Sequence, residues 1–432
     1  ATTAHSAVYR GHMRNKGAEV NSGQKLWKRA KKVIPAGNML LSKRPEMFLP
    51  ERWPAYFSRT NGYLVWDLDG NEYADLALMG VGTNLLGYNH DEVDDAVRSI
   101  INAGNMSSLN GPEEVLLAEK LVDMHGFAEM ARFCRTGGEA SAVAIRLARA
   151  STGREKIAFC GYHGWHDWYL AANLLSEDQL NSHLLPGLEP NGVPQSLKGS
   201  VLAFEYNQLD QLEALIRDHD LAAIMMEVVR NIHPEEGFLQ RVRQLADKHG
   251  IVLIFDECTT GFRETFGGIH KKYDVEPDLA VFGKALGNGY AITAVIGTRA
   301  VMDAANSSFI SSTFWTERIG SAAALKVLEI MEREKSWETV TEIGLKLRRC
   351  WQEMAGRHRV SINCGGVPAI GGFSFESKNG QKYKTLISQE LLAKGFLAGT
   401  SVYASVVHDD RIIDLYLDAL DVVFEKIQAC ED

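Results

Sequence analysis

The sequence contains no run of 18 or more apolar residues, so it predicts no membrane-spanning helix. Its N-terminus lacks the charged-then-apolar pattern of a secretory signal peptide. Only six cysteines occur in 432 residues, and none forms a Cys-x-x-Cys pair. In a chain of this length, scattered cysteines predict reduced thiols and a cytoplasmic location.

Positive charge is not in excess either. The 46 lysines and arginines are outnumbered by 55 aspartates and glutamates, which gives a net charge of −9. Such a surface repels phosphate backbones and argues against a nucleic-acid partner. The chain has no internal repeat and no low-complexity segment. Its length predicts two or three domains with a core large enough for an enzyme.

The beginning of the chain divides into an extension and a first helix. Residues 1–20 are small and polar, and Gly11-His12-Met13 fits a cloning remnant as well as native sequence. We treat them as an N-terminal extension. Residues 21–34 have the apolar spacing of a helix, with Ser22 as its expected N-cap and Pro35 as its stop.

The middle of the chain alternates short apolar runs with amphipathic helices. The runs are 156–160, 201–205, 222–227, 251–256, 279–282 and 292–297, and helices fit 140–150, 208–217 and 238–249. This alternation predicts an α/β fold with a mostly parallel sheet covered by helices on both faces. Ligands of such sheets bind beyond the carboxyl ends of the strands, where Glu227 and Asp256 fall.

The flanking sequence differs from this middle part. A hairpin is expected over 63–73, and long helices over 319–333, 337–355 and 410–428. We predict that residues 21–74 and 319–432 form a smaller α+β domain, and that 75–318 form the large domain. Residues 176–199 are the one long irregular stretch, a feature typical of functional or mobile loops.

Two residues of the middle part indicate the chemistry. Asp256 ends the apolar run that begins at Ile251, and Lys284 stands alone in a glycine-rich segment. A desolvated lysine has a lowered pKa and becomes a neutral nucleophile. A buried carboxylate needs a partner, and a protonated pyridine nitrogen is one. An amine for a Schiff base and a carboxylate for the pyridine are what a pyridoxal phosphate (PLP) enzyme requires. A surface lysine and a carboxylate that caps a helix or pairs with Arg263 are the alternatives.

Three further segments could contact such a cofactor. Gly137 and Gly138 precede a helix, where free backbone N–H groups bind anions, although Gly-Gly turns are common. Tyr162 follows a strand and could stack on a ring. The neighbouring histidines have no third ligand at a suitable spacing, so we predict no metal. The hydroxyls of 311–316 could reach a phosphate across a dimer interface or simply cap a helix.

In this order, the segments resemble the class III PLP-dependent aminotransferases of fold type I, closest to the glutamate-1-semialdehyde 2,1-aminomutase branch. The resemblance covers about residues 22–428. It depends on Ser22–Pro35, Val65–Tyr73, Gly137–Ala140, Tyr162–Gly164, Phe255–Arg263 and Gly283–Gly289.

The resemblance implies a role for each residue of the cofactor site. Lys284 would form the Schiff base and carry a proton between substrate and cofactor. Asp256 would pair with the pyridine nitrogen, and Tyr162 would stack on the ring with His163 beside it. Glu227 occupies the acidic position that the family keeps near the site.

It also implies a homodimer with shared active sites. Gly137 and Gly138 would bind the cofactor phosphate through backbone N–H groups, and Thr313 would do so from the partner subunit. No hydroxyl stands at position 138, where the family usually has threonine. This departure should loosen the phosphate cup or make room for another group.

Other departures fall on the substrate wall. The family usually has proline and Gly-Asn after the acidic residue, whereas this chain has Val228-Val229-Arg230-Asn231, which places Arg230 near the cofactor. Arg44 stands in a segment whose register differs from that of the aminomutases, and Trp315–Arg318 replaces their pattern after Thr313. We therefore predict Arg230 and Arg44 as substrate-binding residues.

These features favour an aminotransferase that works by ping-pong half-reactions. We expect an amino acid donor, L-glutamate, and a carbonyl acceptor such as a sugar or keto-sugar of a surface-polysaccharide pathway. The alternatives are an intramolecular aminomutase of the glutamate-1-semialdehyde type and a PLP-dependent racemase or epimerase. A non-catalytic binding protein of this fold would not need the electron sink that Asp256 and Lys284 provide.

Overall fold

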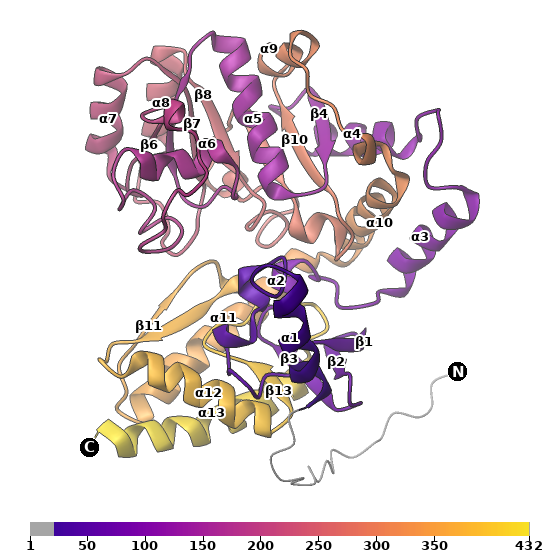
Figure 1. Ribbon diagram of the computed structural model, residues 1–432, viewed down its shortest axis with the longest axis vertical. Helices are drawn as coiled ribbons and strands as arrows, with labels where there is room; N and C mark the ends of the chain where they lie inside the picture. Colours follow the sequence, from indigo (N-terminus) through magenta and orange to yellow (C-terminus); the bar gives the residue numbers. More distant parts are fainter. Residues whose placement is uncertain (1–20, 432) are drawn as a thin grey trace. The chain divides into compact units, whose positions relative to one another are not determined.

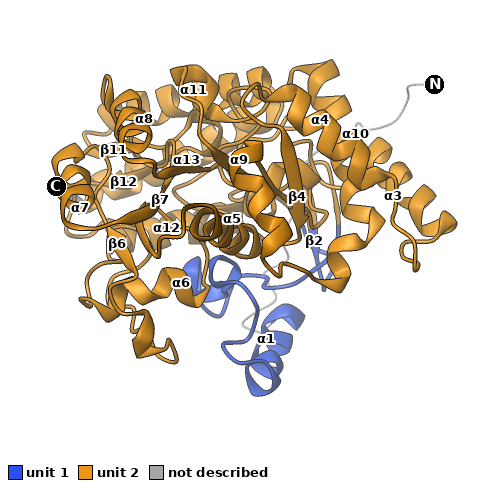
Figure 2. Cartoon of the chain, turned by 90° about the horizontal axis from the view of Figure 1, so that it is seen from above, with its two compact units in different colours: residues 1–59, 66–72 blue, residues 60–65, 73–432 orange. Residues whose placement is uncertain are grey.

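The computed structural model describes residues 21–431, so the predicted extension over 1–20 lies outside the described residues. Contacts divide the chain into two compact units (Figure 2). One takes in residues up to 59 together with 66–72, and the other takes in 60–65 together with 73–432. None of the helices described is both long enough and apolar enough to cross a bilayer. The predicted boundaries at residues 74 and 318 stay predictions.

The second unit contains a seven-stranded sheet. Its order is β4 (Met130–Cys134), β10 (Thr293–Gly297), β9 (Leu279–Phe282), β8 (Val252–Asp256), β7 (Leu221–Glu227), β5 (Lys156–Cys160) and β6 (Val201–Ala203). All neighbours are parallel except β10, which is antiparallel to β4 and β9. The predicted mostly parallel sheet is confirmed. Strand β4 was missed because Arg132 interrupts its apolar sequence; this side chain donates to the carbonyl of Ile310 at 2.7 Å.

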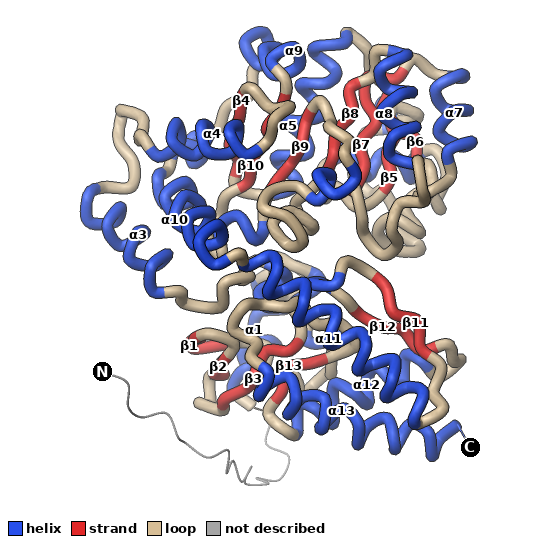
Figure 3. The backbone as a smooth tube through the Cα atoms, turned by 180° about the vertical axis from the view of Figure 1, so that it is seen from behind, coloured by secondary structure: helices blue, strands red, loops and turns tan. Residues whose placement is uncertain are grey.

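Helices bury both faces of this sheet (Figures 1 and 3). Along β8, Val252 and Ile254 join the core beneath α5 (Gly137–Thr152), whereas Leu253 and Phe255 join the core beneath α7 (Leu209–Asp218) and α8 (Phe238–His249). This alternation follows from the two-residue period of a strand. A strand covered on both faces must be apolar throughout, so a polar residue at its end stands out.

Two helix starts differ from the prediction. Helix α1 (Ser22–Val33) is capped by Asn21, whose side chain accepts from the amide of Gln24, so the predicted cap at Ser22 is wrong. Helix α5 begins at Gly137 rather than at 140, because Thr136 and Glu139 form a capping box. The two glycines therefore lie in the first helical turn, where backbone N–H groups have no intrahelical acceptor.

The C-terminal part builds a separate core. Its helices are α10 (Arg318–Glu334), α11 (Ser336–Arg357), α12 (Gly380–Ala393) and α13 (Asp410–Glu431). Helices α10, α11 and α13 agree with the predicted long helices, whereas α12 was not predicted. Strand β13 (Phe396–Ala398) pairs in parallel with β3 (Glu72–Leu76), and β11 (Ile362–Gly365) pairs with β12 (Gly372–Phe375). Trp351, Tyr416 and Phe424 fill this core.

The remaining elements are short or lie beside the large sheet. Helix α10 packs against α3 and α4. The bounds are β1 (Phe57–Asn61), β2 (Leu64–Asp67), α2 (Met79–Gly82), α3 (Asp91–Ala103), α4 (Glu113–Met124), α6 (Asp167–Leu170) and α9 (Arg299–Met302). Residues 176–194 contain no helix or strand, as expected for the irregular stretch.

Candidate active site

The carboxyl ends of neighbouring strands gather the predicted site residues at one edge of the sheet. Glu227 ends β7 and Asp256 ends β8, and the two residues are direct partners in the register. Tyr162 and His163 follow β5, whereas Lys284 follows β9. The parallel order of these strands explains why Tyr162 and Lys284, 122 positions apart in the chain, share one edge.

Asp256 is buried, with 5% of its surface exposed, and it has two partners. One oxygen, Oδ1, accepts from the backbone N–H of Cys258 at 3.0 Å, and Oδ2 lies 2.8 Å from Nδ1 of His163. The other ring nitrogen of His163 lies 3.0 Å from the carbonyl of Cys160. The two ring nitrogens of His163 therefore face two oxygen atoms, one from the Asp256 carboxylate and one from the Cys160 carbonyl, and these contacts fix the orientation of the ring.

Two glycines allow the loop after β5 to approach Glu227 at the end of β7 and Gly138 at the start of α5. Gly161 and Gly164 have φ angles of 106° and 103°, which residues other than glycine rarely adopt. A Cβ atom on Gly161 would lie 2.6 Å from Oε2 of Glu227, and one on Gly164 would lie 2.8 Å from Cα of Gly138. The loop is thereby seated against both β7 and the start of α5.

Lys284 has the properties expected of a nucleophilic amine. Its Nζ donates to Oγ1 of Thr259 at 2.7 Å. Burial lowers the pKa of this amine below its usual range. The residue itself has a φ of 45°, an uncommon conformation for a side chain with a Cβ atom and one that is typical of functional positions.

Close packing surrounds the N-terminus of α5. A Cβ atom on Gly137 would come within 3.3 Å of Sγ of Cys258, and one on Gly283 would come within 3.2 Å of the same sulfur. Position 138 is roomier, because a Cβ atom there would meet Trp165 only at 3.6 Å. A side chain would therefore fit at position 138, where this chain has glycine.

Glu227 is a buried carboxyl whose pKa is raised by burial. Its Oε2 accepts from the backbone N–H of Tyr162 at 3.0 Å and lies 3.4 Å from Nη1 of Arg230. Arg230 also donates to the carbonyl of His183 at 2.6 Å. A cleft of about 160 Å³ opens beside these residues, and Glu205 lies on its wall.

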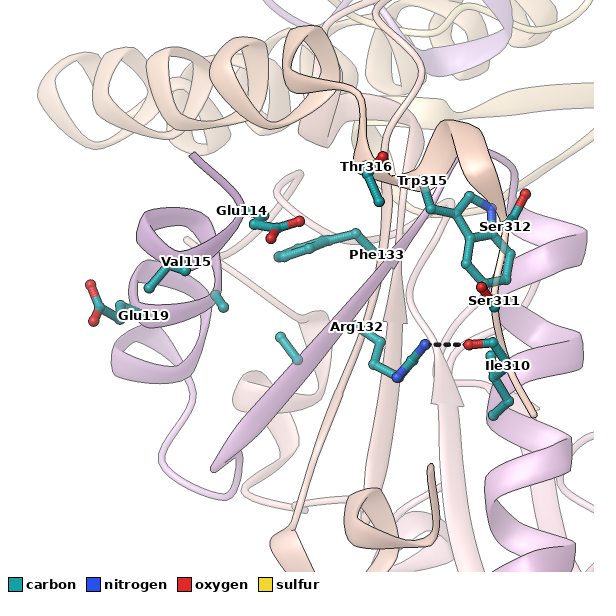
Figure 4. Close-up of a pocket in the computed structure, with 12 residues that line it drawn as sticks. Glu114, Val115, Glu119, Arg132, Phe133, Ile310, Ser311, Ser312, Trp315 and Thr316 are labelled. Atoms are coloured by element: carbon teal, nitrogen blue, oxygen red, sulfur yellow. Dashed lines mark hydrogen bonds between the residues drawn. The ribbon is translucent and has the colours of Figure 1, made fainter. Parts of the chain in front are cut away.

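Thr313 lies in a different setting. It is exposed at the start of a short helix, Thr313–Thr316, and Phe314 beside it is 69% exposed. A cleft of about 420 Å³ lies next to this helix (Figure 4). Its lining includes Ser311, Ser312 and Trp315 on one side and Glu114 and Val115 of α4 on the other.

The structure thus brings most of the predicted residues into one unit, and it corrects one alternative. Asp256 does not pair with Arg263, whose guanidinium donates to the carbonyls of Thr259 and Gly82. Arg44 belongs to the first unit, and its predicted substrate role stays a prediction. Sequence reasoning missed Thr259, although it lies inside the motif that begins at Phe255.

This donor set suits PLP. Free N–H groups at the start of a long helix attract a phosphate, a buried carboxylate suits a protonated ring nitrogen, and an amine with a lowered pKa suits an aldehyde. Within residues 21–431, no group of three or more histidine, cysteine or acidic side chains is arranged to hold a metal ion.

Comparisons with known proteins agree with this chemistry. The model of the family described as Aminotransferase class-III matches residues 50–415. A 3-aminobutyryl-CoA aminotransferase of Cloacimonas acidaminovorans is 36% identical over 371 residues, which cover 84% of this chain and 85% of that protein. A glutamate-1-semialdehyde 2,1-aminomutase of Methanothrix thermoacetophila is 31% identical and covers 95% of this chain and 98% of its own length.

Solved structures give the same picture. The PLP internal aldimine form of the Sphingopyxis sp. MTA144 FumI protein superimposes with a TM-score of 0.84 at 27% identity, covering 94% of this chain and 96% of that one. An omega-transaminase from Sphaerobacter thermophilus gives 0.82 at 25% identity, with 94% and 97% covered. The fold of the chain is therefore that of the PLP-dependent aminotransferases of fold type I.

Proposed function

Since this chain belongs to the class III family of PLP-dependent aminotransferases, we propose that it transfers an amino group between two molecules, from L-glutamate to a carbonyl acceptor. The observation that carries the proposal is the partly buried amine of Lys284 on the same sheet edge as the buried Asp256. PLP, when bound, supplies the aldehyde that takes up the amino group and the ring that accepts electrons.

The residues of the chain have separate tasks in this proposal. The N–H groups of Gly137 and Gly138 hold the phosphate, and Asp256 holds the proton on the ring nitrogen with His163 as its second partner. The neutral amine of Lys284 would attack the cofactor aldehyde to form the Schiff base. The same amine would later carry the proton between the substrate carbon and the cofactor carbon. Tyr162 would stack one face of its ring on the cofactor ring. Its neighbour Tyr169 is nearly perpendicular to it, with 6.2 Å between the ring centroids.

The similarity to aminomutases favours a second candidate, an amine shift within one molecule. Amine labelled with ¹⁵N distinguishes the two. Transfer between molecules places the label of L-glutamate in the product and releases one equivalent of the 2-oxo acid. An intramolecular shift proceeds without any donor and leaves the product unlabelled, and this result would reject the transfer between two molecules.

The nature of the acceptor is a finer part of the proposal. The segments 161–165 and 314–318 resemble those of class III enzymes that act on sugars of surface-polysaccharide pathways, which supports a sugar or keto-sugar acceptor. The six cysteines are free, which supports a reducing, cytoplasmic location. A screen of keto-sugars against simple 2-oxo acids as amine acceptors tests the acceptor class.

Arg230 is the proposed anchor for an anionic group of the acceptor. Its guanidinium is partly exposed beside Glu227, so it has N–H groups left for a ligand. We expect Arg230→Ala to raise the acceptor KM roughly 10- to 100-fold, the effect of losing one charge-assisted hydrogen bond. The donor KM should change little. Arg230→Lys, which keeps the charge, should recover part of the affinity, and an unchanged acceptor KM in the alanine variant would remove this role.

Thr313 is proposed to contact the phosphate bound by a second copy of the chain. Its exposure, with Phe314 and Phe309 beside it, supports an interface at this position. A Lys284→Ala chain and a Thr313→Ala chain are each defective, but a mixed dimer would have one intact site. Mixing equal amounts at limiting PLP should restore about one quarter of wild-type activity, because half the dimers are mixed. Action of Thr313 within its own subunit would give no recovery.

A further inference from the structure

Thr259 accepts hydrogen bonds from two basic side chains, those of Lys284 and Arg263. Its hydroxyl oxygen accepts from Nζ of Lys284 at 2.7 Å, and its backbone carbonyl accepts from Nε of Arg263 at 2.5 Å. One residue therefore connects the proposed Schiff-base lysine with a buried guanidinium.

Arg263 is an unusual buried charge. Only 1% of its surface is exposed, and within residues 21–431 its side-chain hydrogen bonds go to backbone carbonyls rather than to a carboxylate. Burial lowers its pKa to about 10. A buried guanidinium without a counter-charge is costly, so its retention indicates a task at this position.

The second contact of Arg263 fixes a strained turn. Its Nη2 donates to the carbonyl of Gly82 at 2.5 Å. The φ angles from Met79 to Gly82 are 41°, 69°, 64° and 78°, four consecutive left-handed residues. A Cβ atom on Gly82 would lie 2.7 Å from the guanidinium. Such strain persists only where surrounding contacts hold it.

The lysine segment holds the other end of this turn. Asn84 donates to the carbonyl of Asn288 at 3.1 Å, and the side chain of Asn288 accepts from the amide of Leu86 at 2.9 Å. Asn288 directly follows the short helix Lys284–Gly287. Arg263 contacts the turn at Gly82 and also contacts Thr259. Asn288, which follows the lysine segment, contacts the residues just after the turn, Asn84 and Leu86.

We propose that Thr259 and Arg263 are positioning residues for Lys284, with Thr259 holding the amine and Arg263 holding Thr259. The inference rests on the proposed Schiff-base role of Lys284. In this arrangement the neutral amine donates one N–H to the hydroxyl, so its lone pair stays free for a carbonyl carbon. The hydroxyl of Thr259 accepts an N–H of the amine, so it orients the amine while the nitrogen lone pair stays available for reaction.

The charge of Arg263 adds to this effect. Burial is the largest cause of the lowered pKa of Lys284, and repulsion by Arg263 lowers it further. The groups that oppose this are Cys258, Glu227 and Asp256. Removing the guanidinium charge should therefore raise the pKa of the amine and reduce its neutral fraction near pH 7.

The test uses the PLP-free protein and four variants. Thr259→Val removes the hydroxyl at nearly constant shape, and Thr259→Ser restores it. Arg263→Met removes the charge, and Arg263→Lys keeps it. Two properties are measured: the pH profile with which an amine-acylating reagent labels Lys284, read by mass spectrometry, and the rate at which added PLP forms the lysine Schiff base, read by absorbance.

We expect Thr259→Val to slow Schiff-base formation about tenfold, as for the loss of one hydrogen bond, and Thr259→Ser to recover it. The labelling profile of Arg263→Met should move to higher pH, whereas that of Arg263→Lys should not. Should Arg263→Met fail to fold, Thr259→Val, whose side chain is only partly buried, still decides. Wild-type rates and profiles in Thr259→Val overturn the inference, whereas a wild-type protein that forms no Schiff base overturns the proposed function instead.

Discussion

Replacing Lys284 by alanine is expected to abolish the visible absorbance band of the PLP-loaded protein and to lower turnover roughly 10⁴-fold or more. The side chain is both the nucleophile and the carrier of the proton, so no neighbouring group can take over its tasks. Its amine makes a hydrogen bond to Thr259, and losing one such bond should cost the fold little stability.

The control is Lys248→Ala, which removes an exposed lysine near the end of α8. Both variants are compared by circular dichroism, thermal unfolding, absorbance with PLP, and turnover. Normal turnover in Lys284→Ala would contradict the assignment of this residue. Loss of folding would be a different result, recognisable from the unfolding curve.

Replacing Asp256 by asparagine is expected to lower kcat about 10²- to 10³-fold, the usual effect of removing one preorganised electrostatic partner. Asparagine keeps the size of the side chain and its contact with the N–H of Cys258. It removes the negative charge that pairs with His163 and that would hold the proton of the ring nitrogen. The chain then loses its means of keeping the ring an acceptor of electrons.

The matched control is Asp220→Asn, an exposed aspartate on the loop before β7. Measurements of kcat and of PLP affinity separate two effects of Asp256→Asn. A fall in kcat at saturating PLP supports the electronic role. An unchanged kcat with weaker PLP binding would show that Asp256 only holds the cofactor, and an unchanged kcat and affinity would remove it from the site.

The strand ends were predictable from sequence because their signal is local. Asp256 ends an apolar run, and a parallel sheet places the ends of such runs at one edge, which also accounts for Glu227. Strand β4 escaped because Arg132 breaks its pattern, yet its pairing with β10 compensates in the folded protein. The cap at Asn21 was missed because Ser22 is an equally good capping residue by type.

Contacts between distant segments could not be predicted in this way. Arg263 reaches the carbonyl of Gly82, 181 positions away, and His163 reaches Asp256, 93 positions away. Neither partner is set by local periodicity, because both depend on how loops cross after the strands are placed. For the same reason, the pairing of Asp256 with Arg263 was a reasonable alternative that only the fold could correct.

The absorbance spectrum of the PLP-loaded protein, recorded before and after addition of L-glutamate, tests the account most directly. We predict a visible band of the lysine Schiff base that L-glutamate converts to the near-ultraviolet band of the aminated cofactor, with release of one 2-oxoglutarate per site. A band that neither L-glutamate nor other amino donors change would contradict transfer between two molecules. No band at all would contradict the cofactor site formed by Gly137, Tyr162, Asp256 and Lys284.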